Sequence, residues 1–297
     1  HHYTDGIIIS RVMTELIDEV LFYLDHNPVL PPLVCLYCII CSIPVVILLI
    51  ATQNCAIHRN CRYLISLWSL SLIGFLVNVA SLYLEMLTFD NGYLPRNLID
   101  PPLRRYFLAV HSMFYVCSSS FEMYIALERI VSTRQPHAYH VREEHWTRLV
   151  PVTIATYIFG AYVGYLIYII DNHLTGLLIY NAIDISTLVI NKFGIYYCKR
   201  RYNALYGKAS LNARYQGSEA YRMTSAMHPV YCASFCIKII ALVIAYVYVF
   251  VVESFSGQIY GVMEAGYFMF HCINCAFSSS FLIMKNDSIR GAVSEAL

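Results

Sequence analysis

Val29–Ala51 reads VLPPLVCLYCIICSIPVVILLIA and contains no charged side chain. A helix that crosses a bilayer needs about 20 mainly apolar residues, because only a helix satisfies its own backbone polar groups within one segment. Further stretches of this kind follow and fill most of the chain. The predicted spans are Val29–Ala51, Tyr63–Leu87, Tyr106–Leu127, Leu149–Ile170, Gly176–Tyr197, Pro229–Val252 and Ile259–Met284. The sequence therefore predicts an all-α, polytopic membrane protein built as a seven-transmembrane helix bundle.

The composition agrees with a membrane protein. The 297 residues are 58% hydrophobic and 13% charged, whereas a typical soluble domain is about 25% charged. The formal net charge is only +1, and the chain has no basic repeat and no basic patch interleaved with aromatic residues. We therefore expect a lipid bilayer as a partner and no nucleic acid.

The basic residues of the loops predict the orientation of the bundle. Of the 20 Lys and Arg residues, 14 fall in the loops on one side of the predicted spans and in the carboxyl-terminal tail. The others are Arg11, Arg96, Arg104 and Arg105 on the opposite side, and Lys192 and Lys238 within spans. Cytoplasmic loops collect Lys and Arg. The amino terminus is therefore predicted outside and the carboxyl terminus inside.

The sequence divides into three predicted regions. Residues 1–28 form an extracellular segment, in which apolar residues recur at helical spacing over Gly6–Leu24 and predict an amphipathic helix. Residues 29–284 form the transmembrane domain, and residues 285–297 form a cytoplasmic tail. The segment Asn212–Met227 is also expected to extend the sixth span as a helix into the cytoplasm.

Ionisable residues inside the predicted spans need an explanation, because each costs about 2.5–3.5 kcal/mol on insertion scales. Counting about 1.5 Å of rise per residue places Glu122, Lys192 and Lys238 at similar depths, roughly 7–13 Å from the inner face. One carboxylate and two ammonium groups at that level predict a structural pair or triad that joins the third, fifth and sixth spans.

The outer half of the bundle has a different set of polar and aromatic residues. A mostly aromatic cavity with a few polar groups is typical of a small-molecule site between helices. The candidate ligand-binding residues are His111, Tyr115, Asn181, Asp184, Tyr246, Glu264, Tyr267 and His271. The alternative for each of them is ordinary core packing, or a place in an interfacial belt of tyrosines.

The inner end of the third span carries an acid–arginine pair, Glu128 and Arg129. An arginine at that depth can pair with its neighbour in one state and reach a cytoplasmic partner in another, which makes a two-state element. A further hypothesis is that Arg129 pairs with Glu219 in the resting state. The alternative is the positive charge expected of any cytoplasmic end.

Catalytic and metal-binding motifs are missing from the sequence. It has no His-Glu-x-x-His motif, no phosphate-binding loop and no nucleophile elbow. We therefore expect neither an enzyme nor a protein that holds a metal or another cofactor.

Two segments resemble boxes of the nematode serpentine chemoreceptors. Ala126–Thr133, ALERIVST, is similar to the Glu-Arg-x-x-(Ala/Ser)-Thr box that ends the third span in that family. Leu211–Ala220, LNARYQGSEA, is similar to the Leu-Ser-x-Arg-Tyr-Gln-x-x-Glu-Asn box before the sixth span, from which Asn212 and Ala220 depart. Together they resemble the Sre (epsilon) class, within the wider group that includes the Sra, Srab and Srb classes.

The resemblance implies a G-protein-coupled receptor that senses small molecules in the ciliary membrane of sensory neurons, a part of the plasma membrane. By the same resemblance the partner is a heterotrimeric G protein. Glu128 and Arg129 would act as the switch, and the cytoplasmic face would include Arg214, Tyr215, Gln216 and Glu219. The motifs of rhodopsin-like receptors are absent: Glu-Arg-Ile replaces Asp-Arg-Tyr, and no Asn-Pro-x-x-Tyr occurs in the last span. A seven-span transporter or a ligand-gated channel is the alternative function.

Overall fold

The computed structural model describes residues 29–55, 57–89, 103–134, 146–205, 211–251 and 257–296. These residues form α-helices, and no strand occurs among them. The helices are α2 (Leu30–Asn54), α3 (Arg59–Phe89), α4 (Arg104–Arg134), α6 (Trp146–Tyr168), α7 (His173–Leu205), α8 (Leu211–Phe250), α9 (Gly257–Lys285) and α10 (Asp287–Ala296). The amphipathic helix predicted over Gly6–Leu24 lies outside the described residues.

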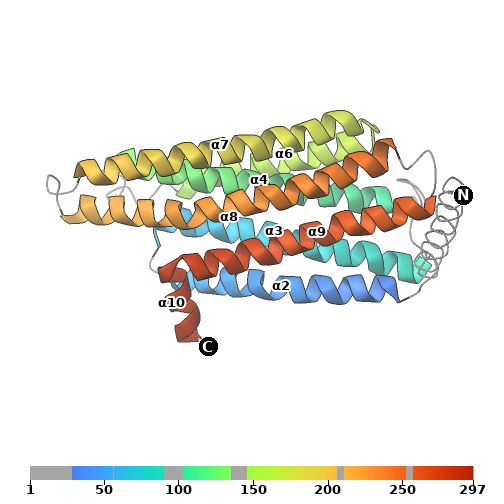
Figure 1. Cartoon of the computed structure of the whole chain (residues 1–297), viewed down its shortest axis with the longest axis horizontal. Helices are drawn as coiled ribbons and strands as arrows, with labels where there is room; N and C mark the ends of the chain where they lie inside the picture. Colours follow the sequence, from blue (N-terminus) through green and yellow to red (C-terminus); the bar gives the residue numbers. More distant parts are fainter. Residues whose placement is uncertain are drawn as a thin grey trace, which may run out of the picture.

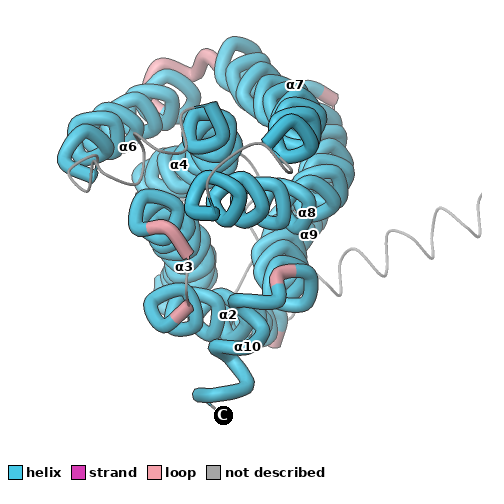
Figure 2. Tube along the Cα trace, turned by 90° about the vertical axis from the view of Figure 1, so that its left-hand side faces the viewer, coloured by secondary structure: helices cyan, strands magenta, loops and turns pink. Residues whose placement is uncertain are grey.

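The long helices lie side by side in one bundle, and the short α10 turns away across one end of it (Figure 1). The end view shows α4 surrounded by other helices (Figure 2), and α4 contacts α3, α6, α7 and α8. On the other side of the bundle α2 packs against α3, α9 and α10. Because α4 touches so many neighbours, its side chains form much of the interior.

Six of these helices, α2, α3, α6, α7, α8 and α9, are long and apolar enough to cross a membrane. The helix α4 is not among the six, although it has the same 31-residue length as α3. The surface of α2 shows the membrane character most clearly. Ile39 and Ile43 are exposed, while Val45 and Leu48 on the opposite face are fully buried. Helices that are apolar on all sides are typical of membrane spans, so the structure indicates a multi-pass helical membrane protein.

Two glycines bring α6 against α4. A Cβ atom on Gly160 would lie 2.9 Å from the carbonyl oxygen of Met113, and one on Gly164 would overlap with the carbonyl oxygen of Ala109. Small residues four apart let helix backbones approach closely in membranes. The Gly160–Gly164 pair therefore sets the distance between the two helices.

We expect Gly164→Ala to lower the melting temperature of the purified protein, because the added methyl group must push α6 away from the α4 backbone. Overpacking of this kind costs about 1–3 kcal/mol. Gly266→Ala is the matched control: it lies within α9 with nothing within 4 Å of the added Cβ, so it should stabilise by about 0.5–1 kcal/mol. Equal melting temperatures for the two variants would contradict this account of the α4–α6 contact.

The sixth predicted span and its extension form one continuous helix. The 40-residue α8 begins at Leu211 and passes through Pro229 without a break. It thus confirms the helical extension predicted over Asn212–Met227.

The tail holds a helix that the sequence analysis did not predict. Asn286 separates α9 from α10, and its side-chain oxygen accepts hydrogen bonds from the backbone N–H groups of Ser288 and Ile289, both at 3.1 Å. Its amide nitrogen contacts the Met223 sulfur on α8 at 2.9 Å. Asn286 therefore caps α10 and ties it to α8.

Candidate functional site

The centre of the bundle holds a buried cluster of charges. The Lys238 Nζ atom on α8 lies 3.0 Å from Glu122 Oε2 on α4 and 3.2 Å from Asp184 Oδ1 on α7. It also donates a hydrogen bond to Ser119 Oγ at 2.8 Å. Each of the three charged side chains is only 4% exposed. The ammonium group has three N–H donors, and this arrangement uses all of them.

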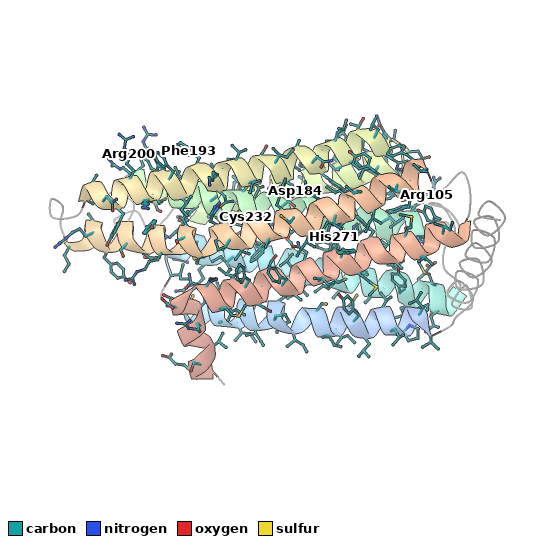
Figure 3. The ribbon with its side chains drawn as sticks, viewed as in Figure 1. Arg105, Asp184, Phe193, Arg200, Cys232 and His271 are labelled. Atoms are coloured by element: carbon teal, nitrogen blue, oxygen red, sulfur yellow. The ribbon has the colours of Figure 1, made fainter. Side chains whose placement is uncertain are left out.

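The remaining carboxylate oxygens of this cluster also accept hydrogen bonds. Trp68 Nε1 donates to Glu122 Oε1 at 3.2 Å, and the Tyr115 hydroxyl donates to Asp184 Oδ2 at 2.5 Å. Buried charges are tolerated when they are paired and hydrogen-bonded. We name Glu122, Asp184 and Lys238 the charge cluster. It joins α4, α7 and α8 about midway along the bundle, where Figure 3 labels Asp184.

The contact between Glu122 and Lys238 lies where the sequence placed it, but the inclusion of Lys192 is wrong. Lys192 is exposed on α7, on the same helix as the labelled surface residues Phe193 and Arg200 (Figure 3). A long basic side chain at that position reaches past the apolar surface toward water. Asp184, which the sequence analysis assigned to ligand binding, is the third member of the cluster instead.

Four of the predicted ligand-binding residues form one aromatic cluster. His111 Nε2 lies 3.2 Å from the Tyr267 hydroxyl. The ring of His271 is 4.7 Å from that of Tyr267 and 5.1 Å from that of Tyr115. All four side chains are buried, and Tyr115 also contacts Asp184. The aromatic cluster is therefore connected to the charge cluster below it.

The other predicted ligand-binding residues are placed differently. Asn181 Nδ2 donates to the Tyr246 hydroxyl at 3.1 Å, so these two half-buried residues join α7 to α8. Glu264 on α9 forms a buried ion pair with Arg104 at the start of α4. The sequence analysis counted Arg104 as an outer-loop charge and missed this pair, because its partner lies 160 residues away along the chain.

The cavities next to these clusters are small. A cavity of about 10 Å³ adjoins the charge cluster. Another, of about 20 Å³, lies between α6, α7, α8 and α9. The second is lined by Ile167, Tyr168, His173, Leu177, Tyr180, Ala245, Tyr248, Val249 and Tyr267. Each has room for about one water molecule, whereas small-molecule sites usually measure about 300–1,000 Å³. A ligand could enter this region only if tyrosine side chains moved.

The carboxyl-terminal part of α4 carries a second charged site. Arg129 is 2% exposed. Its guanidinium contacts Glu128 through Nε, and through Nη2 at 2.6 Å. Its Nη1 lies 3.6 Å from Glu219 Oε1 on α8. The backbone N–H of His58, in the turn between α2 and α3, donates to the same Glu219 oxygen at 3.0 Å. Glu219 thus links α4, α8 and the α2–α3 turn.

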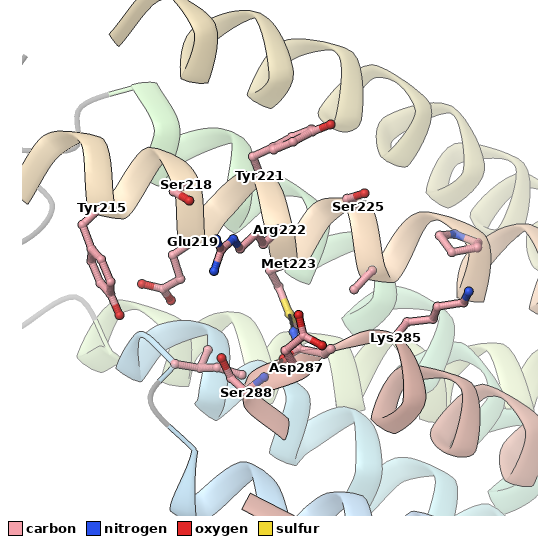
Figure 4. Close-up of a pocket in the computed structure, with 14 residues that line it drawn as sticks. Tyr215, Ser218, Glu219, Tyr221, Arg222, Met223, Ser225, Lys285, Asp287 and Ser288 are labelled. Atoms are coloured by element: carbon pink, nitrogen blue, oxygen red, sulfur yellow. Dashed lines mark hydrogen bonds between the residues drawn. The ribbon is translucent and has the colours of Figure 1, made fainter. Parts of the chain in front are cut away.

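The remaining residues of the predicted cytoplasmic face lie on the first turns of α8. Tyr215 is exposed and Arg214 is half-buried, while the Gln216 side chain lies outside the described part. Tyr215 and Glu219 line a cleft of about 680 Å³ between α8 and the start of α10 (Figure 4). Glu219 forms part of the wall of this cleft.

No protein-family model matches the chain, and no curated protein matches it. Among the described residues, no group of three or more His, Cys, Asp and Glu side chains is arranged to hold a metal ion.

Proposed function

We propose that this chain is a G-protein-coupled chemosensory receptor with seven membrane spans, as its resemblance to the nematode Sre class implies. A small molecule binds in the outer half of the bundle, and the cytoplasmic ends of α4, α7 and α8 pass the signal to a heterotrimeric G protein. The resemblance further implies the plasma membrane of sensory cilia as the location.

The placement of α4 supports a seventh span. Its 31 residues extend over about 46 Å at 1.5 Å per residue, which is more than the thickness of a bilayer core. Three of its charged residues face protein, since Arg104, Glu122 and Arg129 are all buried in ion pairs. A helix enclosed by neighbours does not need an apolar surface toward lipid.

The distribution of basic residues supports the orientation. The α7–α8 connection and the tail carry the larger share of Lys and Arg, and such loops face the cytoplasm. Arg129 and the cleft beside Glu219 then face the cytoplasm, and the aromatic cluster lies toward the outside.

The observation that carries the proposal is the contact of Arg129 with Glu219. It joins α4 to α8 at the end where a G protein would dock, and its Glu219 member lines the cleft. Ligand binding would favour a second state in which the inner end of α8 moves away. Arg129 would then keep its contact with Glu128 and become accessible to the G protein.

Glu219→Gln tests this proposal without a known ligand. We expect it to raise ligand-free nucleotide exchange on the coupled G protein about two- to fivefold, because a weakened contact of about 0.5–1 kcal/mol shifts the population of states by that factor. The measurement is GTP exchange with receptor in nanodiscs and a panel of heterotrimers.

Asp287→Asn is the matched control for Glu219→Gln. Asp287 also lines the cleft but pairs with Arg290 on α10 at 2.6 Å, so its loss should leave exchange unchanged. No rise with Glu219→Gln, or an equal rise with both variants, would remove the Arg129–Glu219 contact from the mechanism.

A transporter or channel remains the alternative function, and the buried acids of the charge cluster are the feature that favours it. Transporter sites are typically built from broken helices near the bilayer midplane. In the described part of the chain, α2 and α8 instead continue through Pro44 and Pro229 as unbroken helices. This continuity favours the receptor.

A further inference from the structure

Four buried cysteines lie on α2 and α9, two helices that pack against each other. Cys38 and Cys41 are three residues apart on α2, and Cys272 and Cys275 are three residues apart on α9. All four are free thiols. The Sγ atoms of Cys38 and Cys272 lie 3.7 Å apart. We name these two residues the thiol pair.

The other two cysteines lie one turn further along the same helices. The Tyr37 hydroxyl on α2 donates to the backbone oxygen of Met269 on α9 at 3.5 Å, across 232 residues, and the thiol pair is 234 residues apart. This nearly constant separation means that α2 and α9 run in the same direction (Figure 1). Cys41 and Cys275 have the same separation as the thiol pair, and residues three apart share one side of a helix. The thiol pair therefore has a second pair of cysteines at the next level of the bundle.

We propose that the thiol pair is an oxidation site, at which a small peroxide forms a reversible disulfide between α2 and α9. The sulfur of one cysteine first attacks hydrogen peroxide, the O–O bond breaks, and a sulfenic acid and one water form. The second sulfur then attacks the sulfenic sulfur, so that the S–S bond forms and a second water leaves. The two cysteines lose two electrons and two protons, which reduce one hydrogen peroxide to two waters.

The geometry of the thiol pair favours the disulfide over further oxidation. The two sulfur atoms have to approach only from 3.7 Å to about 2.05 Å. A partner held this close intercepts the sulfenic acid, whereas a sulfenic acid without a thiol beside it proceeds to the sulfinic acid. Because the thiolate is the stronger nucleophile and these thiols are buried, we expect the bond to accumulate over hours.

The bond would fasten the part of α9 that carries the aromatic cluster. Cys272 directly follows His271 in the sequence, so a disulfide to Cys38 holds this turn of α9 against α2. A disulfide between residues far apart in the chain stabilises a fold mainly by constraining its unfolded state. The site depends only on the packing of α2 against α9, and it would form whether or not the protein couples to a G protein.

The test is to treat the purified protein in nanodiscs with millimolar hydrogen peroxide and map its cysteines. Remaining thiols are blocked with N-ethylmaleimide, and peptic peptides are analysed by mass spectrometry. The main product at Cys38 and Cys272 should be the peptide pair linked by a disulfide, and dithiothreitol should restore both thiols. Unchanged thiols, sulfinic acid at these two positions, or a bond between other cysteines in its place would overturn the proposal.

Cys117 is the control within the same molecule. It is as deeply buried as Cys272, but its sulfur contacts the backbone oxygen of Thr156 at 3.8 Å. We expect no cross-linked peptide from Cys117 under the same treatment. Cross-linking of Cys117 to the same extent would show that peroxide joins cysteines without regard to this geometry, and it would contradict the assigned pair.

Variants of α9 connect the bond to its effect. Cys272→Ala should abolish the cross-link, whereas Cys275→Ala is the matched control and should leave it intact. The oxidised wild type should melt about 5–10 °C above the reduced protein, and peroxide should not raise the melting temperature of Cys272→Ala. Equal loss of the cross-link in both variants would contradict the assigned pair. A bonded protein that melts no higher than the reduced one would contradict the fastening of α2 to α9.

Discussion

Lys238→Met is expected to abolish the accumulation of folded protein. The substitution leaves Glu122 and Asp184 buried without a counter-charge, and breaking a buried ion pair costs about 3–5 kcal/mol. That amount is comparable to the whole stability of many proteins, about 5–15 kcal/mol. The measurement is the yield of monodisperse protein after detergent extraction, followed by thermal melting.

Removing the charges together should restore folding. In Glu122→Gln/Asp184→Asn/Lys238→Met no charge remains in the cluster, and the two amide oxygens can still accept from Trp68 and Tyr115. The double variant Glu122→Gln/Lys238→Met should recover only partly, because Asp184 keeps its charge without a counter-charge. Full recovery in the double variant, or none in the triple variant, would contradict the three-residue cluster.

Lys192→Met is the matched control for Lys238→Met. It removes the same kind of side chain from an exposed position on α7. Its effect on stability should stay within about 0.5 kcal/mol, as for most surface substitutions.

Arg129→Ala is expected to have the largest effect on signalling. If Arg129 is the group that contacts the G protein, its loss should return exchange to the level without receptor. The ligand need not be known, because the substitution can be made in the Glu219→Gln background. In that background the raised basal exchange should disappear if Arg129 contacts the G protein. If Arg129 only held α8 in the resting state through Glu219, the basal exchange would stay raised.

Arg134→Ala controls for the loss of positive charge at the same end of α4. Arg134 is exposed in the last turn of the helix, so exchange in the Glu219→Gln background should persist. Persistent exchange with Arg129→Ala would remove Arg129 from the switch. If the Arg129→Ala variant melts far below the Glu219→Gln protein, it would be compared with Arg129→Lys. Lysine keeps the positive charge but loses the bidentate hydrogen-bond geometry of the guanidinium group.

The sequence predicted the helices well because a membrane span is a long, local signal. Hydropathy located α2, α3, α6, α7, α8 and α9, and the rise per residue brought Glu122 and Lys238 to similar depths. The depth of a residue along its helix does not determine which side of the helix its side chain faces. Lys192 passed the depth criterion but lies on the outer surface, while Asp184 faces Lys238.

Long-range pairs and the tail were harder to predict. The partner of Arg104 is 160 residues away, and the local sequence shows only a basic dipeptide before an apolar run. The helix α10 did leave a signal, since Ile289, Ala292 and Val293 recur at helical spacing. Ile289 and Ala292 are buried in the structure, so a search for that period in the tail would have found the helix.

A measurement of membrane topology tests whether α4 crosses the bilayer, and the receptor proposal requires that it does. Glycosylation acceptors in inserted linkers would be placed in residues 1–28, in each connection between helices and after α10. Seven spans predict modification of residues 1–28 and of the α3–α4, α6–α7 and α8–α9 connections, with the tail and the other connections unmodified. Modification of the tail together with the amino-terminal segment would mean an even number of spans and would contradict the receptor.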